Sequence, residues 1–509
     1  MATLVESELR SLNPATLEVV GSVPVTLDVA GVVADAVAAW RPPPLAERRA
    51  LLLRLARAVL AHADEIAETI SAETGKPLAE AYTTELLLAV EQVAWLAKNV
   101  ERVLAPEQVR YGIPYLAHKR AHVVYEPLGV VGIVAPWNFP FSIPLTQAAS
   151  AVAAGNAVVL KPSELTPLSG EWVAQVFAEA GSRVDVVQGG GEVGHALVTA
   201  PGVAKIVFTG SPSTGRRVAA AAAELLRPVT LELGGKDPML VLRDADVVRA
   251  ADGAAWGAFA NCGQVCVGVE RIYVARELFP AFVDALAARA RALRFGEDLG
   301  PLITEEARAR VEDLVAEAME HGAEAVTGAR RPQVAWPGWF YEPTVLAGGD
   351  ARARIEREEV FGPVFTVQPF DSEDEAVDRA NASSFALGAS VWTRDASRAR
   401  ELASRLDAGM VWTNDLGYSY GAGPAPWGGR KESGYGRTHS KHGLYELSNV
   451  KLVDDDTGRL PVPWWYPYDT RALDGFRGVL EGLHGDAKLR ALWRHRRGLL
   501  YLGRRYLRR

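Results

Sequence analysis

Gly129-Val130-Val131-Gly132-Ile133-Val134 consists of β-branched residues and glycine, without the polar alternation of a strand that faces water on one side. Such a run is typical of a parallel strand that is buried on both faces. Further strands are expected at 157–160, 184–187 and 206–208, with a helix from Trp172 to Ala180. Strands that alternate with helices predict a doubly wound α/β domain with a parallel sheet.

The segments on both sides of this run extend the pattern. Residues 31–104 are rich in Ala and Leu at helical spacing, and they break at Gly75-Lys76-Pro77. A second α/β series follows the first, with elements expected at 271–274, 278–294, 308–322, 364–367 and 389–392. A chain of 509 residues is too long for one hydrophobic core, so we expect two or three domains.

The composition is that of an ordinary globular protein, with 49% hydrophobic and 23% charged residues. Two cysteines cannot build a secreted disulfide framework, and the N-terminus does not resemble a signal peptide. No apolar run reaches the roughly 20 residues that span a bilayer. A cytoplasmic location is therefore expected.

The charge is distributed unevenly along the chain. Residues 471–509 contain 11 Lys and Arg against 3 Asp and Glu, while the remainder contains 44 against 59. A Pro- and aromatic-rich linker at 461–468 precedes this C-terminal basic tail, which we assign to 459–509. The tail could bind an anionic membrane surface as a basic amphipathic helix or pack against the acidic body of a neighbouring subunit. We favour the second interpretation, and we expect no nucleic-acid partner because no recognition motif is present.

Both cysteines lie in Phe259-Ala260-Asn261-Cys262-Gly263-Gln264-Val265-Cys266. A thiolate is a strong nucleophile toward carbonyl carbon, which makes Cys266 a candidate catalytic residue. Free cysteines are also often inert core residues, and Cys262 fits that description. The histidines are scattered and no cluster has metal-ligand spacing, so no metal is expected.

Several polar residues follow expected strands, where ligands of open α/β sheets bind. Lys161 and Glu164 could bind ribose hydroxyls or form a solvated turn. The turn Thr209 to Gly215 could hold a phosphate at a helix N-terminus, or simply cap that helix through Ser211 or Ser213. Gly189 to Gly194 fits G-x-G-x-x-G, which indicates either a dinucleotide loop or an ordinary turn.

Two further residues are candidates for acid–base and oxyanion chemistry. Glu232 lies between two leucines, and apolar surroundings raise the pKa of a carboxyl toward that of a general base. A lone Glu at a sheet edge that faces water is the alternative. Asn138 ends the strand at 129–134 and could donate an N–H to an oxyanion, or merely form a turn.

Together and in this order, the segments resemble the NAD(P)-dependent aldehyde dehydrogenase superfamily of the hydrolytic, non-CoA type, from about Asn13 to about Val453. The step of 34 residues from Glu232 to Cys266 is also similar to the family's spacing. The matching segments are Asn13-Pro14-Ala15-Thr16, Pro136-Trp137-Asn138, Lys161-Pro162-Ser163-Glu164, Phe208-Thr209-Gly210-Ser211 with Gly215, Glu232-Leu233-Gly234-Gly235-Lys236, Asn261 to Cys266, Glu358-Glu359-Val360-Phe361-Gly362-Pro363 and Gly428-Gly429-Arg430-Lys431-Glu432-Ser433-Gly434.

The resemblance implies a mechanism. Cys266 would attack an aldehyde to form a thiohemiacetal whose oxyanion is held by Asn138 and the Cys266 backbone N–H. Hydride transfer to nicotinamide would leave a thioester, and Glu232 would activate the water that hydrolyses it to a carboxylic acid. Many family members carry a Glu after the Gly-Arg pair that relays protons to the base. This chain has Thr438 there, so a shorter or water-mediated relay and slower deacylation are expected.

The resemblance also implies the cofactor site. Lys161 and Glu164 would bind the adenosine ribose, and a carboxylate there repels a 2′-phosphate, so NAD is favoured and NADP is the alternative. Gly189 to Gly194 becomes a loop near the adenine. The other implied cofactor-binding residues are Trp137, Gly210, Ser211, Gly215, Glu359 and Phe361.

The expected substrate is an apolar or aromatic aldehyde. Members that take succinate semialdehyde commonly present Arg in the channel, whereas this chain has Thr146 and Ala260 at two such positions. The channel residues expected are Phe141, Leu145, Trp412 and Trp427, with Ile143, Pro144, Tyr418 and Tyr420 near the entrance. A succinate semialdehyde-like substrate, a CoA-acylating enzyme and a catalytically retired structural or binding protein of the same fold are the alternatives.

The family's organisation implies three parts and an assembly. We expect a Rossmann-like NAD-binding domain from 1–105 and 128–234, and an α/β catalytic domain from 235–440. An oligomerisation arm is expected from 106–127 and 441–458. The arm implies a homodimer or homotetramer.

Overall fold

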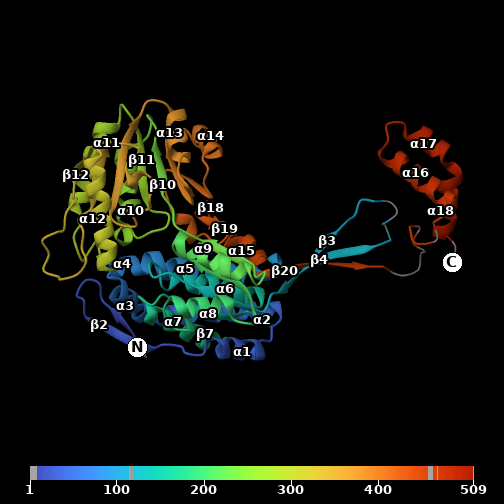
Figure 1. Cartoon of the computed structure of the whole chain (residues 1–509), viewed down its shortest axis with the longest axis horizontal. Helices are drawn as coiled ribbons and strands as arrows, with labels where there is room; N and C mark the ends of the chain where they lie inside the picture. The colour runs from blue at the N-terminus through green and yellow to red at the C-terminus, as the bar shows by residue number, and fades with distance from the viewer. Residues whose placement is uncertain are drawn as a thin grey trace. The chain divides into compact units, whose positions relative to one another are not determined.

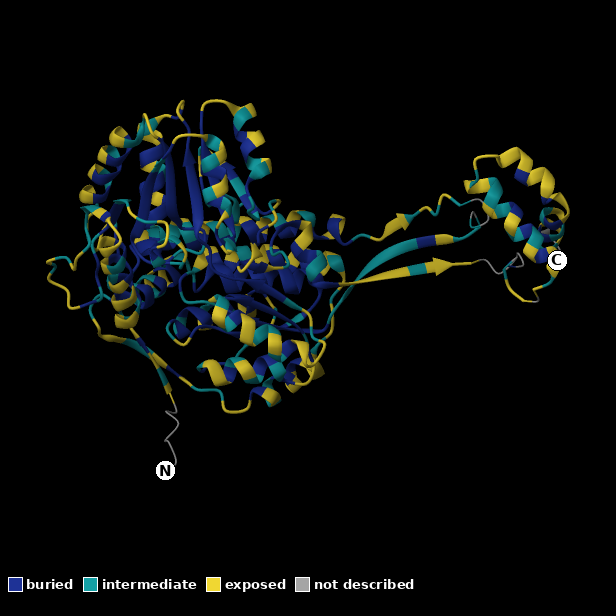
Figure 2. Ribbon diagram, turned by 45° about the horizontal axis from the view of Figure 1, so that its top comes forward, coloured by how far each residue is buried: buried dark blue, intermediate teal, exposed yellow. Residues whose placement is uncertain are grey.

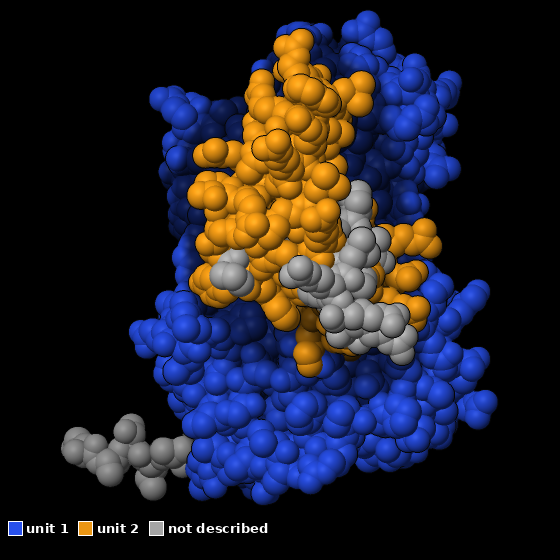
Figure 3. All heavy atoms as spheres, turned by 90° about the vertical axis from the view of Figure 1, so that its right-hand side faces the viewer, with its two compact units in different colours: residues 1–104, 126–449 blue, residues 105–125, 450–509 orange. Residues whose placement is uncertain are grey.

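The computed structural model describes residues 8–113, 116, 118–456, 462, 464–466 and 468–507 (Figure 1). The chain divides into two compact units, which Figure 3 distinguishes by colour. Unit 1 comprises residues 1–104 and 126–449, and unit 2 comprises residues 105–125 and 450–509. Unit 1 contains both large sheets.

The first sheet of unit 1 has six strands in the order β19-β9-β8-β5-β6-β7. The four pairings among β9, β8, β5, β6 and β7 are parallel, while β19 is antiparallel to β9. The strands are β5 (Val130–Val134), β6 (Ala157–Lys161), β7 (Val184–Val186), β8 (Val203–Thr209), β9 (Val229–Glu232) and β19 (Gly434–Tyr435). Helices α6 (Ser142–Ala154), α7 (Pro167–Glu179), α8 (Gly191–Thr199) and α9 (Pro212–Ala223) alternate with them. The expected doubly wound parallel sheet is therefore confirmed.

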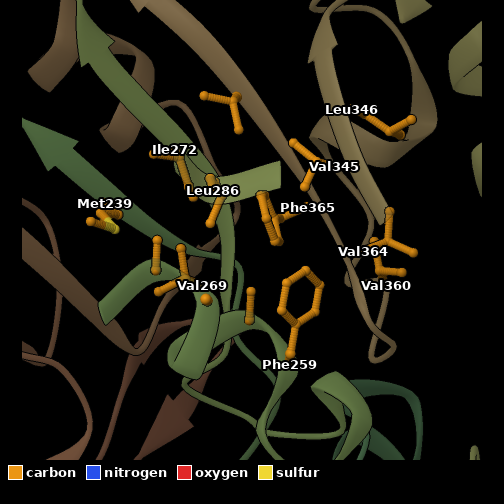
Figure 4. Close-up of a cluster of buried hydrophobic side chains, with 14 of the residues drawn as sticks. Met239, Phe259, Val269, Ile272, Leu286, Val345, Leu346, Val360, Val364 and Phe365 are labelled. Carbon is orange, nitrogen blue, oxygen red and sulfur yellow. The ribbon is translucent and has the colours of Figure 1, made fainter. Parts of the chain in front are cut away.

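The second sheet of unit 1 has seven strands in the order β12-β13-β14-β11-β10-β16-β17, with only β12 antiparallel to its neighbour. Its strands are β10 (Asp237–Val241), β11 (Val269–Ala275), β12 (Ala323–Thr327), β13 (Thr344–Gly348), β14 (Val364–Phe370), β16 (Gly388–Trp392) and β17 (Met410–Thr413). Its helices are α10 (Val247–Phe259), α11 (Phe279–Ala292), α12 (Glu305–Glu320), α13 (Glu373–Asn381) and α14 (Ala396–Arg405). Figure 4 shows part of its core, where Phe259 of α10 and Leu286 of α11 meet Ile272 and Phe365 of the strands.

Helices and short elements surround these sheets. The N-terminal part contains β1 (Glu8–Leu12), β2 (Val19–Pro24), α1 (Val29–Ala39), α2 (Leu45–Ala61), α3 (Ala63–Thr74), α4 (Leu78–Glu80), the π-helix η1 (Ala81–Leu86) and α5 (Leu87–Val103). The expected break is present, since Gly75 ends α3 in the left-handed region at φ 70°. The remaining short elements are η3 (Ala260–Gly263), η4 (Arg354–Glu356), β15 (Phe385–Ala386), η5 (Tyr418–Tyr420), β18 (Arg430–Lys431) and α15 (Ser440–Glu446).

Unit 2 holds most of a three-stranded sheet and a helical tail. The sheet has the order β20-β4-β3, from β3 (Glu107–Val109), β4 (Arg120–Pro127) and β20 (Ser448–Asp455). The tail contains α16 (Thr470–His484), α17 (Lys488–Arg494) and α18 (Arg496–Leu507). α16 and α18 approach closely because both carry glycine at the contact: a Cβ on Gly498 would lie 2.2 Å from the backbone nitrogen of Gly475. Figure 2 shows that the tail helices also present exposed faces.

The compact units differ from the domains expected from sequence at two points. Residues 441–449 belong to unit 1, because the Asn156 side chain donates a 2.8 Å hydrogen bond to the Leu447 carbonyl and α15 packs on α6. Strand β19, inside the expected catalytic range 235–440, joins the first sheet through β9. Within the part of the chain that is described, no helix is long and apolar enough to cross a membrane.

Candidate active site

A four-residue link, Leu233 to Lys236, connects β9 of the first sheet directly to β10 of the second. Glu232 is the last residue of β9, and the residues around Cys266 lead into β11 beside β10. A Cβ on Gly235 would lie 2.2 Å from the carbonyl oxygen of Cys266, so only glycine allows this approach. The link therefore brings the cysteine turn against the end of the strand that carries Glu232.

The cysteine turn has an unusual backbone. Asn261, Cys262 and Gly263 are consecutive residues with φ of 50°, 56° and 70°. Two of them are not glycine, which makes this segment a strained one. The Glu80 carboxylate holds it in place by accepting from the Asn261 backbone N–H at 3.0 and 3.1 Å. The strain turns the chain sharply between α10 and Cys266.

The two cysteines have different surroundings. Cys262 is 1% exposed and is part of the hydrophobic core of the second sheet, which fits the inert role expected for it. Cys266 is only partly buried and lines two hollows described below. Burial, followed by the negative charges of Glu232 and its neighbours, raises the pKa of the Cys266 thiol above its ordinary value. Cys266 is therefore an accessible thiol that needs a base before it can act as a nucleophile.

Glu232 does not face water at a sheet edge, so that alternative is wrong. Its side chain is 6% exposed, and burial raises its pKa to about 7. The Thr438 hydroxyl donates to Oε1 of Glu232 at 2.6 Å, and this bond and the Arg437 charge limit the rise. A carboxyl with a pKa near 7 is suited to accept a proton at neutral pH.

Asn138 is held by a buried network. Its side-chain Nδ2 donates to the Gln264 carbonyl at 3.0 Å, which occupies one of its two amide hydrogens. Its backbone carbonyl accepts from Lys76 Nζ at 2.8 Å and from Asn261 Nδ2 at 3.0 Å. Lys76 is paired with Glu85 at 2.8 Å, and both side chains are fully buried. The network leaves the second amide hydrogen of Asn138 available in a fixed direction.

Sequence reasoning missed this network. Lys76 was recognised only as part of a helix break, and Glu85 was not singled out. Glu85 also accepts hydrogen bonds from the backbone N–H groups of Phe141 and Ser142 at the start of α6. The available signal was a lysine between Gly75 and Pro77, a place where a solvated side chain is the ordinary expectation.

A polar cleft of about 700 Å³ lies where the two sheets meet. It brings together most of the residues that were expected to act in catalysis or to bind the cofactor. These are Trp137, Asn138, Gly210, Ser211, Glu232, Cys266, Glu359 and Phe361. Ser211 is the N-cap of α9, where its hydroxyl accepts from the Thr214 N–H at 3.3 Å. Gly215 does not line the cleft; a Cβ there would lie 2.6 Å from Leu233, so it permits close packing of α9.

The side of the cleft near Phe361 is fixed by a carboxylate that the sequence did not single out. Glu270 accepts from the N–H groups of Val360 and Phe361, and it pairs with the buried Lys236. The Phe361 ring contacts Trp137 edge-on, with ring centroids 5.5 Å apart. Burial raises the pKa of Glu359 to about 8, although its carboxylate accepts from the Gly235 N–H at 2.9 Å.

Lys161 and Glu164 lie outside the residues that line this cleft. Lys161 ends β6, next to β5, and its Nζ donates to Glu164 at 2.8 Å. Burial tends to raise the pKa of Glu164, but the Lys161 charge and hydrogen bond lower it below its ordinary value. Gly189 to Gly194 likewise do not line the cleft; Gly190 caps α8, and Gly191 to Gly194 form its first turn.

A second hollow, an apolar cavity of about 80 Å³, reaches Cys266 from another side. Its lining contains Trp427, Ile143, Tyr420 and Ala260, which were expected near the channel. It does not contain Phe141, Leu145, Trp412, Pro144 or Tyr418, so this cavity does not support their expected place along the channel. It also contains residues that were not expected: Thr84, Leu88, Phe139, Trp256, Gly257, Asn261, Val265, Val267, Leu416 and Gly417.

Phe141, Leu145 and Trp412 have one property in common, which is deep burial. Phe141 and Leu145 are completely buried at the start of α6, a helix in which all 13 residues are buried. Trp412 is 4% exposed in β17, where its indole N–H donates to Ser419 at 2.9 Å. An apolar residue in a fully buried element gives no sign of which neighbour it faces. Thr84 and Leu88 lie four residues apart, where the π-helix leads into α5. Nothing in the sequence around them indicates that they line a cavity at Cys266.

A thiol and a buried carboxylate that line one cleft at the junction of two α/β sheets are the arrangement expected of an enzyme that performs covalent catalysis beside a bound cofactor. Comparison with known proteins agrees, since the model of the aldehyde dehydrogenase family matches residues 3–453. The chain belongs to the aldehyde dehydrogenase family. Membership confirms the enzyme class expected from the sequence, an NAD(P)-dependent aldehyde dehydrogenase.

Individual relatives cover most of the chain. A betaine aldehyde dehydrogenase of Cereibacter sphaeroides is 38% identical over 440 residues, covering 85% of this chain and 89% of its own. A 4,4'-diapolycopene aldehyde oxidase of Methylomonas is 37% identical over 456 residues, covering 88% and 85%. The NAD+ complex of a Bacillus cereus aldehyde dehydrogenase has a TM-score of 0.84 at 34% identity, covering 88% of this chain and 93% of that one.

Proposed function

We propose that this enzyme oxidises an apolar or aromatic aldehyde to the carboxylic acid, with NAD as the cofactor. The observation that carries the proposal is the position of Cys266, which lines both the polar cleft and the apolar cavity. An aldehyde held in the cavity would present its carbonyl to the thiol at the point where the cleft begins. The aromatic and aliphatic lining provides favourable surroundings for an apolar substituent.

The chain's own residues account for the acyl chemistry. Cys266 forms the thiohemiacetal, and the free amide hydrogen of Asn138 and the Cys266 backbone N–H stabilise its oxyanion. Removal of one such donor typically costs about 10²–10³ in rate. Glu232, with its pKa of about 7, takes the proton from the water that hydrolyses the thioester. Cys266 thus carries the acyl group between two steps, and no metal or histidine acts on it directly.

The cleft fits a dinucleotide at several points. The N-terminus of α9, capped by Ser211, would hold the pyrophosphate through backbone N–H groups. Glu359 would bind the nicotinamide ribose, and Phe361 with Trp137 would pack near the ring. Bound NAD+ supplies the hydride acceptor, and the Bacillus cereus relative was solved with NAD+. Lys161 and Glu164 remain the proposed adenosine-ribose ligands, where the Glu164 charge favours NAD over NADP.

The cavity also bears on the alternative substrates. Among its lining residues, all of them described, there is no Lys or Arg, so a carboxylated substrate such as succinate semialdehyde would lack a cation. The relatives act on chemically different aldehydes by name, a betaine aldehyde and a long apolar carotenoid aldehyde. Trp256, Tyr420 and Trp427 offer aromatic faces that could also attract a quaternary ammonium, so betaine aldehyde is the second candidate.

NADH formation from an aldehyde panel tests this proposal. We expect kcat/KM for hexanal and benzaldehyde to exceed that for succinate semialdehyde by at least about 10-fold, the effect of roughly 1.4 kcal/mol. Betaine aldehyde and the presence or absence of CoA complete the panel. Strong preference for succinate semialdehyde would contradict the substrate assignment. A requirement for CoA would indicate the acylating enzyme, and no NADH from any aldehyde would indicate the retired protein.

The assembly is also proposed, as a cytoplasmic homodimer or homotetramer in which the basic tail packs on a neighbouring copy. The tail exposes large apolar side chains, with Leu480 64%, Leu489 84% and Trp493 70% exposed. Its positive charge is complementary to the acidic remainder of the chain. These features support a protein partner, while a membrane surface is the alternative.

Truncation after Asp469 distinguishes the two partners of the tail. We expect the full chain to sediment as a larger or more stable oligomer than the truncated chain, with the difference reduced by salt. Co-sedimentation with phosphatidylserine vesicles is measured in parallel, and phosphatidylcholine vesicles serve as the control. Unchanged assembly together with tail-dependent binding to anionic vesicles would contradict the subunit contact.

A further inference from the structure

Glu232 has a hydrogen-bonded chain on the side away from solvent. Oε1 of Glu232 accepts from the Thr438 hydroxyl at 2.6 Å, and the same hydroxyl oxygen lies 3.0 Å from Nδ1 of His439. Thr438 is fixed by its backbone N–H, which donates to the Trp427 carbonyl at 2.9 Å. A carboxyl, a hydroxyl and an imidazole are therefore connected in one continuous line.

His439 is buried and strained. Its side chain is 3% exposed, and its backbone has φ 48°. The Tyr420 ring packs against the imidazole with centroids 4.6 Å apart. Burial lowers the pKa of His439 to about 3, so the ring stays neutral at physiological pH. A neutral imidazole can donate from one nitrogen and accept at the other.

A small cavity lies beyond His439. Its volume is about 10 Å³, near the lower limit for one water molecule. Two buried atoms of residues that line it, His439 Nε2 and Gln147 Oε1, have no hydrogen-bond partner among the described residues. Thr230 and Ser150 add hydroxyl groups to the lining. The cavity therefore has both the room and the polar groups that a single ordered water requires.

A partly exposed carboxylate also lines this cavity. Glu446 lines the cavity, and its side chain is 37% exposed. It accepts from Lys205 Nζ at 2.7 Å. Arg437 is the other charged residue in the lining. Glu446 can therefore pass a proton between the cavity and bulk solvent.

We propose that Thr438, His439 and one water in this cavity form a relay that carries the proton from Glu232 to Glu446 and solvent. The inference rests on the proposed function, because it concerns the proton that Glu232 gains during thioester hydrolysis. That proton passes to Thr438 Oγ1 as the hydroxyl proton passes to His439 Nδ1, and the Nε2 proton leaves to the water. Glu232 returns to a carboxylate, and His439 changes tautomer without becoming charged. The starting tautomer is restored when the ring reorients and gives the Nδ1 proton to the water, because exchange through Thr438 would return that proton to Glu232.

Two pairs of variants test the relay. Thr438→Val removes the hydroxyl at nearly constant shape, and Thr438→Ser restores it. His439→Asn keeps a hydrogen-bonding atom near Nδ1 and tolerates positive φ, but it cannot shuttle a proton. We expect Thr438→Val and His439→Asn to lower kcat by about 10²-fold, the lower range for lost acid–base catalysis. The first turnover of NADH formation keeps its rate, so a burst of NADH precedes the slow phase.

Chemical rescue and a matched control sharpen the test. His439→Gly accepts the same backbone angle and leaves space for added imidazole, which is expected to restore kcat in this variant but not in Glu232→Gln. His442→Asn, an exposed histidine three residues further on, should keep the wild-type kcat. Thermal unfolding checks that each variant is folded.

The outcomes separate the relay from the activity that it serves. If wild type forms NADH while Thr438→Val and His439→Asn keep kcat, the relay is wrong and the dehydrogenase stands. A slower first turnover without a burst would also overturn it, because the residues would then support an earlier step. No NADH from wild type with any aldehyde would contradict the proposed function itself. If the His439 variants do not fold, the comparison of Thr438→Val with Thr438→Ser decides whether the relay exists.

Discussion

Cys266→Ala is expected to reduce kcat for aldehyde oxidation by at least about 10⁴-fold, since loss of a covalent nucleophile leaves only binding and oxyanion stabilisation. The residue lies where the apolar cavity meets the polar cleft, so no other described side chain can replace its sulfur. NADH formation with hexanal measures the effect. The fold should be unaffected, because Cys266 is only partly buried and belongs to no strand or helix.

Cys262→Ala is the matched control for this prediction. Cys262 lies four residues from Cys266, and its side chain is enclosed in the core of the second sheet. Its backbone is left-handed, and we expect it to stay so when alanine replaces the cysteine. We expect this variant to retain activity and to lose about 1 kcal/mol of unfolding free energy, as a small truncation in a packed core does. If Cys262→Ala were inactive and Cys266→Ala active, the nucleophile would be misassigned.

Glu232→Gln is expected to separate the two halves of the reaction. The amide is nearly isosteric but cannot accept a proton, so hydrolysis of the thioester should slow by about 10²–10⁴-fold. Rapid mixing should then show a burst of about one NADH per subunit, followed by slow turnover. A slow first turnover without a burst would mean that Glu232 is needed before the thioester forms.

The pH profile gives a second measure of the same residue. Because burial raises the pKa of Glu232 to about 7, the carboxylate that can accept a proton is depleted as pH falls below that value. Wild-type kcat should therefore rise with pH through about 7 and level off above it. Glu232→Gln should lose this inflection while keeping any that belongs to binding of the aldehyde. If wild type and Glu232→Gln gave the same pH profile, Glu232 would not act in the rate-limiting step.

Much of the fold was predictable because its strands are chemically uniform. The valine-rich run of β5 and the apolar strands β6 and β8 have few plausible states besides buried parallel strands. The catalytic and cofactor-cleft residues were named because the chain order of several weak motifs matched one family. The cleft then gathered eight of those residues from both sheets.

The lining of the apolar cavity was predicted only in part, and the reason is physical. Helix α6 is buried on every side, so the apolar Phe141 and Leu145 resemble channel residues as closely as the true lining residue Ile143 does. Leu88 comes from α5, far from Cys266 in sequence, and Trp256 comes from α10 shortly before the cysteine turn, yet no local pattern shows that either residue faces Cys266. Orientation within a dense core depends on tertiary packing, which periodicity does not report.

The link Leu233 to Lys236 has a consequence for recombination between relatives. A single crossover there gives a chimera with Glu232 from one parent and Cys266 from the other. Both hollows are lined from both sides of that point, since Ile143 precedes it and Trp427 follows it in the apolar cavity. Aldehyde preference can therefore not be inherited as one block of sequence, whereas a cofactor preference set by Glu164 would be inherited with the segment before the link. Chimeras that exchange the aldehyde specificity intact must replace segments on both sides of the link together.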